Sequence, residues 1–143
     1  MQDAPSAAEI AAMPEVIQAI ELAWVDSEPD NASKRHEEGG WIYWDPKKSV
    51  VAVVRVKRGA RAGINFENPP VLKTKYLIAK FHTHPNPSAE GWNTGPSESD
   101  MMFDELDGVP DLIRADDGIH VSGPERRRGG LRGNPGYPEQ EKS

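Results

Sequence analysis

The sequence predicts a single α/β (α+β) domain built on one mixed, mostly antiparallel sheet, and three observations predict it. The chain has 143 residues, of which 36% are hydrophobic, enough to bury one modest core but not two. Thirteen Gly and thirteen Pro favour short strands and many turns over long helices. Segments with helical and strand-like patterns follow one another as helix, three strands, helix and two strands, with no internal repeat.

The first half of the predicted domain contains one helix and two strands. Residues 1–13 are expected to be disordered. Apolar residues at helical spacing predict a helix from Pro14 to Trp24, because proline is tolerated in a first helical turn. Residues 39–44 predict a strand, since aromatic residues dominate this segment. From Val50 to Lys57 the even positions are apolar and the odd positions become charged, which is typical of a strand with one solvent-exposed face.

The second half contains a central strand, a helix and a hairpin. Residues 75–82 are almost continuously apolar, which predicts a strand in the middle of the sheet. After a polar loop, a helix is expected over residues 97–106, with Ser97 as its N-cap. Residues 112–121 predict a hairpin with Asp-Gly at the turn. The domain is therefore expected to span residues 14–123, and the Arg/Gly/Pro-rich tail, residues 124–143, to be disordered.

Charge and cysteine content disfavour several classes of function. A net charge of -6 argues against a protein that binds nucleic-acid backbone. Basic residues within 55–61 are expected on the wet face of a strand, with a patch for an acidic partner or nucleic acid as the alternative. Those at 126–128 are expected in a solvated tail, with RNA binding as the alternative. The absence of Cys means that any metal must be held by His and carboxylates.

The sequence has no pattern of a signal peptide and no run of 18 apolar residues, so no membrane association is expected. A chain without Cys also fits a reducing compartment. A cytoplasmic location is therefore expected, with export as an effector domain as the alternative.

Two histidines at the end of the predicted central strand form a candidate metal site. His82 and His84 are two residues apart, so the period of a strand sends both imidazoles to the same face, roughly 6 to 7 Å apart at Cα. A catalytic zinc ion takes three protein ligands and keeps the fourth position for water. Asp100 is the natural third ligand, because the next helix would hold it rigidly after the loop returns.

The attacking water also needs a general base within hydrogen-bond reach. Glu37 and Glu38 both stand directly before a predicted strand, and alternation allows only one of them to face the histidine pair. Other histidines lack such a pattern: His36 and His120 are interpreted as surface or turn residues. Ser97 and Asp100 alone are also what helix capping would select.

Together these residues resemble the JAMM (JAB/MPN) metalloprotease superfamily over roughly residues 36–122. Among its members, the chain is most similar to prokaryotic JAB-like proteins. The motifs are Glu37-Glu38-Gly39-Gly40, His82-Thr83-His84-Pro85, and Ser97-Glu98-Ser99-Asp100. The resemblance implies a curved sheet flanked by helices, with cytidine-deaminase-like layering. It also implies zinc bound by His82, His84 and Asp100, with Glu37 as the base, as in the family's Glu-x-x-Gly pattern, and Ser97 as a hydrogen-bond donor to the oxyanion.

The family's activity would be hydrolysis of peptide or isopeptide bonds, with a ubiquitin-like protein among the possible substrates and a larger protein assembly as a possible context. The alternative is a non-catalytic scaffold of the same fold. One departure stands out: twelve residues, Pro85 to Pro96, separate His84 from Ser97, where the usual pattern has seven. A longer loop costs little closure entropy, but it leaves the approach of Asp100 open. Trp92, within this loop, is expected to shape a substrate groove.

Overall fold

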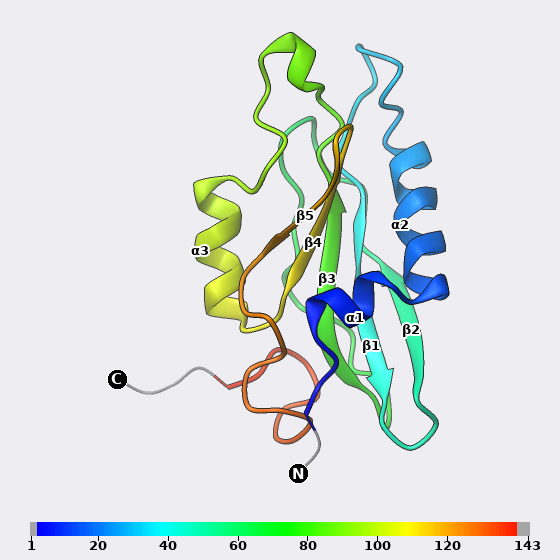
Figure 1. Cartoon of the computed structure of the whole chain (residues 1–143), viewed down its shortest axis with the longest axis vertical. Coiled ribbons are helices and arrows are strands. Elements are labelled where there is room, and N and C mark those ends of the chain that lie inside the picture. The colour runs from blue at the N-terminus through cyan, green and yellow to red at the C-terminus, as the bar shows by residue number, and fades with distance from the viewer. Residues whose placement is uncertain (1–2, 140–143) are drawn as a thin grey trace.

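The computed structural model describes residues 3–139 and contains an open five-stranded sheet with helices on both faces (Figure 1). The strand order is β2-β1-β3-β4-β5, and every neighbouring pair is antiparallel except β3 and β4, which are parallel. The predicted fold class, α+β with a mixed and mostly antiparallel sheet, is therefore confirmed. The strands are β1 (Gly39–Asp45), β2 (Val50–Arg55), β3 (Tyr76–Thr83), β4 (Asp111–Ala115) and β5 (Gly118–Ser122).

The helices cover the two faces of the sheet unequally. α1 (Ala7–Ala11) and α2 (Pro14–Asp26) lie over one face, and α3 (Glu98–Asp107) lies over the other (Figure 1). The main core fills the space beneath α1 and α2, where buried side chains from both helices meet those of β1, β3 and β4. The opposite face is less apolar and holds a smaller cluster around Trp41 and Tyr43. On this second face, polar side chains can therefore lie between the sheet and α3.

The helix boundaries follow from the local sequence. α2 begins at Pro14, as predicted, and ends at Asp26, slightly beyond the predicted end. α3 begins after Ser97, whose side chain accepts a hydrogen bond from the backbone N–H of Asp100, while the Asp100 carboxylate accepts one from the backbone N–H of Ser97. Gly108 ends α3 with a φ of 72°, a left-handed conformation that glycine adopts without strain.

The expected disorder at the two ends of the chain is wrong for the residues that the structure describes there. Within residues 3–13, α1 forms behind a capping box made by Ser6, and Ile10 is fully buried in the core. Within residues 124–139, the guanidinium of Arg127 is buried and donates to several backbone carbonyls, those of Leu77, Gly130, Arg132, Asn134 and Gly136. Residues 1–2 and 140–143 lie outside the described residues.

The two terminal segments lie side by side at one end of the sheet (Figure 1). A bridge joins Ser6 to Arg126, and the backbone N–H of Ala7 donates to the carbonyl of Glu125. The composition of the tail predicted disorder because the tail lacks an apolar stretch; one buried arginine, Arg127, organises it instead. Arg127 is consequently not available for RNA.

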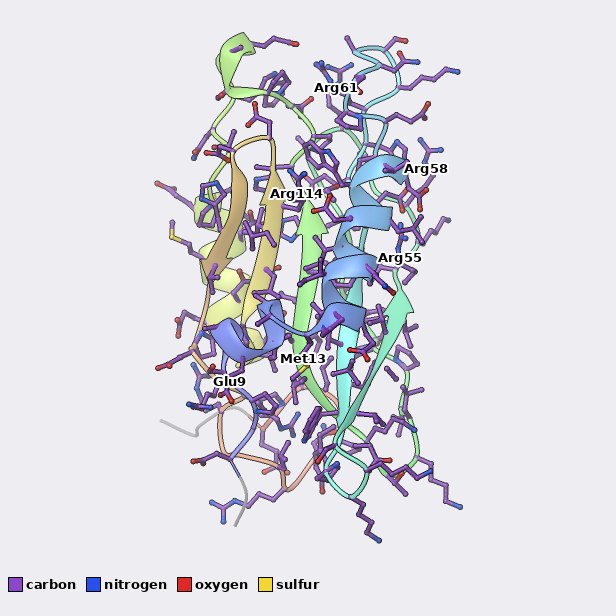
Figure 2. The ribbon with its side chains drawn as sticks, turned by 45° about the vertical axis from the view of Figure 1, so that its right-hand side comes forward. Glu9, Met13, Arg55, Arg58, Arg61 and Arg114 are labelled. Carbon is purple, nitrogen blue, oxygen red and sulfur yellow. The ribbon has the colours of Figure 1, made fainter. Side chains whose placement is uncertain are left out.

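The basic residues of the β2 segment run along the α2 side of the molecule (Figure 2). Arg55 forms ion pairs with Asp26 and Glu38, at 3.1 and 2.9 Å, and Arg61 donates to the backbone carbonyl of Ala32. Arg55 and Arg61 therefore have partners within the chain and need no external ligand to explain their presence. Among residues 3–139, no helix has the length and apolar character needed to cross a bilayer.

Candidate metal centre

The end of β3 brings both predicted histidines together with the predicted aspartate. The Nε2 atoms of His82 and His84 lie 3.1 Å apart. The carboxylate of Asp100, in the first turn of α3, places Oδ1 3.6 Å from Nε2 of His82 and Oδ2 3.3 Å from Nε2 of His84. Three candidate ligands from two elements therefore converge on one point.

The outer nitrogens of the two imidazoles are each held by an oxygen acceptor. His82 Nδ1 lies 3.1 Å from Oδ1 of Asp111, and His84 Nδ1 lies 3.3 Å from the backbone carbonyl of Thr94. When both rings are neutral, these acceptors keep the proton on Nδ1 in each ring. Both Nε2 lone pairs then point toward the Asp100 carboxylate, an arrangement that a cation between them would satisfy.

Two overlapping sets of side chains could hold a metal ion in the described part of the chain. Within each set, ligand atoms lie no more than 4.8 Å from one another. One set is Glu37, His82 and His84, and the other is His82, Asp100 and Asp111. These buried and half-buried His, Asp and Glu residues fit a metal ion by their chemistry and by the orientation of their rings.

Strand alternation separates the two candidate bases. Glu37 points to the face of α3, where its Oε1 lies 4.0 Å from Nε2 of His82. Glu38 points to the opposite face, where its oxygens lie 2.5 Å from Nε2 of His36 and 2.9 Å from Nη2 of Arg55. Only Glu37 is therefore positioned to act beside the histidine pair. His36, interpreted from the sequence as a surface or turn residue, is instead a buried partner of Glu38.

Burial changes the acidity of the carboxyl groups around the site. Burial raises the pKa of Glu37 to about 7, and the nearby histidines only partly oppose this effect. Although burial opposes it, His82 and His84 in their protonated form hold the pKa of Asp100 well below its usual range. The candidate ligand Asp100 is thus kept charged, whereas Glu37 is able to exchange a proton near neutral pH.

A cluster of charged side chains lies beneath the histidines. Lys80, on β3, places Nζ 2.8 Å from Oδ1 of Asp104 and 2.6 Å from Oδ2 of Asp107, both on α3. Asp111 pairs with Lys80 in the register of the parallel strands β3 and β4. Burial, together with the charge of Asp111, raises the pKa of Asp104 to about 7. The single ammonium of Lys80 opposes this shift only in part, since it faces several carboxylates.

A groove of about 870 Å³ opens over the candidate metal ligands. Ser97 lies on its lining, as do Glu37, His84 and Asp100. Its walls carry large apolar side chains that remain partly exposed: Trp92 from the loop after β3, Phe103 and Leu106 from α3, and Phe66 from the loop after β2. The expectation that Trp92 lines a groove is borne out.

The C-terminal segment contributes one wall of this groove, which the sequence did not predict. The hydroxyl of Tyr137 donates to the backbone carbonyl of Phe66 at 2.8 Å, and Trp41 Nε1 donates to that hydroxyl at 3.2 Å. The ring of Phe66 stands edge-on to the ring of His82, with centroids 5.8 Å apart. The tail therefore fixes an aromatic wall directly beside a candidate ligand.

The longer loop between His84 and Ser97 does not displace Asp100. Asn86 donates to the backbone carbonyl of Arg61 at 3.0 Å, and Nη1 of Arg35 donates to both carboxylate oxygens of Glu90 in the short 3₁₀ helix η1 (Ser88–Glu90). These contacts fix the extra residues of the loop to the rest of the chain. The first turn of α3 therefore still faces the two histidines.

Sequence reasoning missed Asp111. The only signal available was an aspartate at the start of an otherwise apolar strand, Asp111-Leu112-Ile113. Its contact with His82 depends on the parallel pairing of β3 and β4, which the sequence did not predict.

A scan against protein-family models gives no match, and searches of curated proteins and of solved structures likewise give none.

Proposed function

We propose that this chain is a zinc-dependent metallopeptidase that hydrolyses peptide or isopeptide bonds, with ubiquitin-like proteins among its candidate substrates. The observation that carries this proposal is the convergence of two imidazoles and a carboxylate within 3.1 to 3.6 Å, beside a buried glutamate and under an open groove. Two histidines and one carboxylate form a known catalytic zinc set. The groove gives a substrate direct access to that set.

His82, His84 and Asp100 would hold the ion, and Asp111 and the Thr94 carbonyl would orient the two rings. Imidazole ligands favour zinc over magnesium or calcium, which prefer oxygen ligands throughout. When bound, zinc supplies Lewis-acid chemistry: it lowers the pKa of a water molecule and polarises a carbonyl oxygen.

Glu37 would act as general base and then as general acid. Its carboxylate takes a proton from the attacking water and delivers that proton to the leaving amine. Its position 4.0 Å from Nε2 of His82 brings it close to the ligand set, and it lines the groove where a substrate would enter. A raised pKa suits a group that must accept and then release a proton.

Ser97 would stabilise the negative charge that develops on the scissile carbonyl oxygen. A hydroxyl can donate one hydrogen bond and accept others. Oγ of Ser97 already accepts from the backbone N–H of Asp100 at 3.0 Å, so capping occupies a lone pair and leaves the O–H to donate. Because Ser97 lines the groove, that donor would be within reach of a bound substrate.

Metal analysis and peptide hydrolysis together test the proposal. The purified protein should hold about one zinc ion per chain, and His84→Ala should hold far less. Glu37→Gln should keep its zinc but hydrolyse a library of internally quenched peptides about 10² to 10⁴ times more slowly. Glu38→Gln is the matched control, because the same substitution falls one residue away on the opposite face of the sheet.

Three outcomes would contradict the proposal. Equal zinc in the wild type and in His84→Ala would remove the metal site. Full hydrolysis by a zinc-loaded Glu37→Gln variant would remove the assigned base. A protein that binds zinc but cleaves no peptide or isopeptide bond would favour the scaffold alternative.

A further inference from the structure

Thr94, in the loop that follows β3, joins this loop to the turn between β4 and β5. The hydroxyl of Thr94 donates to Oδ2 of Asp117 at 2.9 Å. The backbone carbonyl of the same Thr94 is the acceptor for Nδ1 of His84, at 3.3 Å. Thr94 is 8% exposed, whereas the side chain of Asp117 is about half exposed at the surface. A single residue thus joins a candidate metal ligand to a distant turn.

Asp117 is itself fixed on its other side. Nε2 of His120 lies 2.8 Å from Oδ1 of Asp117. Hydrogen bonds from His120 and Thr94 hold the pKa of Asp117 below its ordinary value. The acceptor for the Thr94 hydroxyl is therefore a charged carboxylate, and hydrogen bonds to charged acceptors are the stronger kind.

We propose that Asp117 is a positioning residue for His84, acting through Thr94. With Thr94 held by its side chain, its carbonyl keeps the proton of His84 on Nδ1 and directs the Nε2 lone pair toward His82 and Asp100. This inference rests on the proposed zinc site. Outer partners of this kind change the metal affinity of a histidine ligand without touching the metal.

The two candidate histidine ligands are then supported by one hairpin in two ways. Asp111, at the start of β4, accepts directly from His82. Asp117, in the β4–β5 turn, reaches His84 through the backbone of the loop. The five extra residues of that loop gain a role, because they carry Thr94 to the position from which its carbonyl meets the ring.

Zinc affinity and the tautomer of His84 test the proposal separately. The affinity is measured by competition with a fluorescent zinc chelator, and the tautomer by the ¹⁵N shifts of histidine-labelled, metal-free protein at pH 8. Asp117→Ala should bind zinc about 10 to 100 times more weakly. Asp117→Asn keeps an oxygen acceptor for Thr94 and should restore affinity to within about threefold of the wild type.

Two further variants supply controls. Thr94→Val removes the hydroxyl but keeps the carbonyl and the side-chain shape. It should weaken zinc binding as much as Asp117→Ala, and it provides the test if Asp117→Ala fails to fold. Ser88→Ala removes the longer contact of the same loop with Asp116, at 3.4 Å, and should leave zinc affinity unchanged.

The tautomer measurement separates this inference from the zinc proposal. In metal-free wild type the proton of His84 should reside on Nδ1, and in Asp117→Ala or Thr94→Val it should distribute over both nitrogens. Wild-type tautomer and affinity in a folded Thr94→Val variant would overturn the inference. Loss of the Nδ1 preference in a protein that binds no zinc at all would uphold the positioning contact while refuting the proposed function.

Discussion

The buried carboxyl group of Asp104 should make the stability of the metal-free protein fall as the pH rises from 5 to 8. Asp104 is fully buried, and its Oδ1 lies 2.8 Å from Nζ of Lys80. Burial and the neighbouring charge of Asp111 raise its pKa from an ordinary 3.8 to about 7. The folded protein therefore binds a proton that the unfolded chain has already lost between these two values.

The size of the effect follows from that difference. Stability from this proton is fully present below pH 4 and is lost as the pH rises through 7, because the folded-state pKa is the higher one. At about 1.4 kcal/mol for each pH unit in between, the free energy of unfolding should drop by about 2 to 3 kcal/mol from pH 5 to pH 8. Asn at this position cannot titrate, so Asp104→Asn should lack this part of the pH dependence.

Urea unfolding of the metal-free protein at pH 5 and pH 8 measures the difference. For each protein, the change in unfolding free energy from pH 5 to pH 8 is measured, and the value for the variant is subtracted from that for the wild type. The contributions of other titrating groups, such as Glu37, cancel in this difference. Asp107→Asn serves as the control, since it removes another carboxylate that contacts Lys80, at 2.6 Å. An identical pH dependence in wild type and Asp104→Asn would refute the assignment of the raised pKa to Asp104.

Three further predictions concern the site and its support. Asp111→Ala should weaken zinc binding about 10 to 100 times in a chelator competition, because His82 loses its acceptor; unchanged affinity would exclude that role. Arg127→Ala should lower the unfolding free energy by about 3 kcal/mol or more, since buried carbonyls lose a charged donor, while exposed Arg132→Ala should change it by less than about 0.5 kcal/mol. Phe103→Ser should raise KM for peptides several-fold with unchanged zinc content; an unchanged KM would mean that this wall does not contact substrate.

The regular elements could be predicted from the sequence because their signals are local. Helical spacing after Pro14 and the cap at Ser97 specify α2 and α3, and the apolar run before His82 specifies the central strand. The candidate ligands could be found for the same reason: two histidines of a strand necessarily share a face. What local patterns left open was which glutamate joins them, and the structure brings Glu37 to that face and turns Glu38 away.

The remaining features depend on contacts between distant segments. Arg127 is ordered by carbonyls from its own tail and from β3, so neither segment alone indicates the burial. Arg127 donates to the carbonyl of Gly136, next to Tyr137, so a distant arginine helps to hold the segment from which Tyr137 reaches the groove. The support of His82 by Asp111 and of His84 by Thr94 and Asp117 likewise requires the register of β3, β4 and the hairpin turn. No periodicity or short motif carries such information.

The burial of Glu37 favours a catalytic role over a scaffold. Its side chain is 6% exposed, and the nearest charged partner recorded for it in the described chain lies 4.0 Å away, beyond hydrogen-bond distance. Burying a carboxylate without a close partner disfavours its charged form, which the raised pKa reflects, and so lowers stability at neutral pH. Glutamine would have the same shape without that cost. A scaffold without a metal ion gains nothing from the carboxylate, whereas the proposed proton transfer requires it.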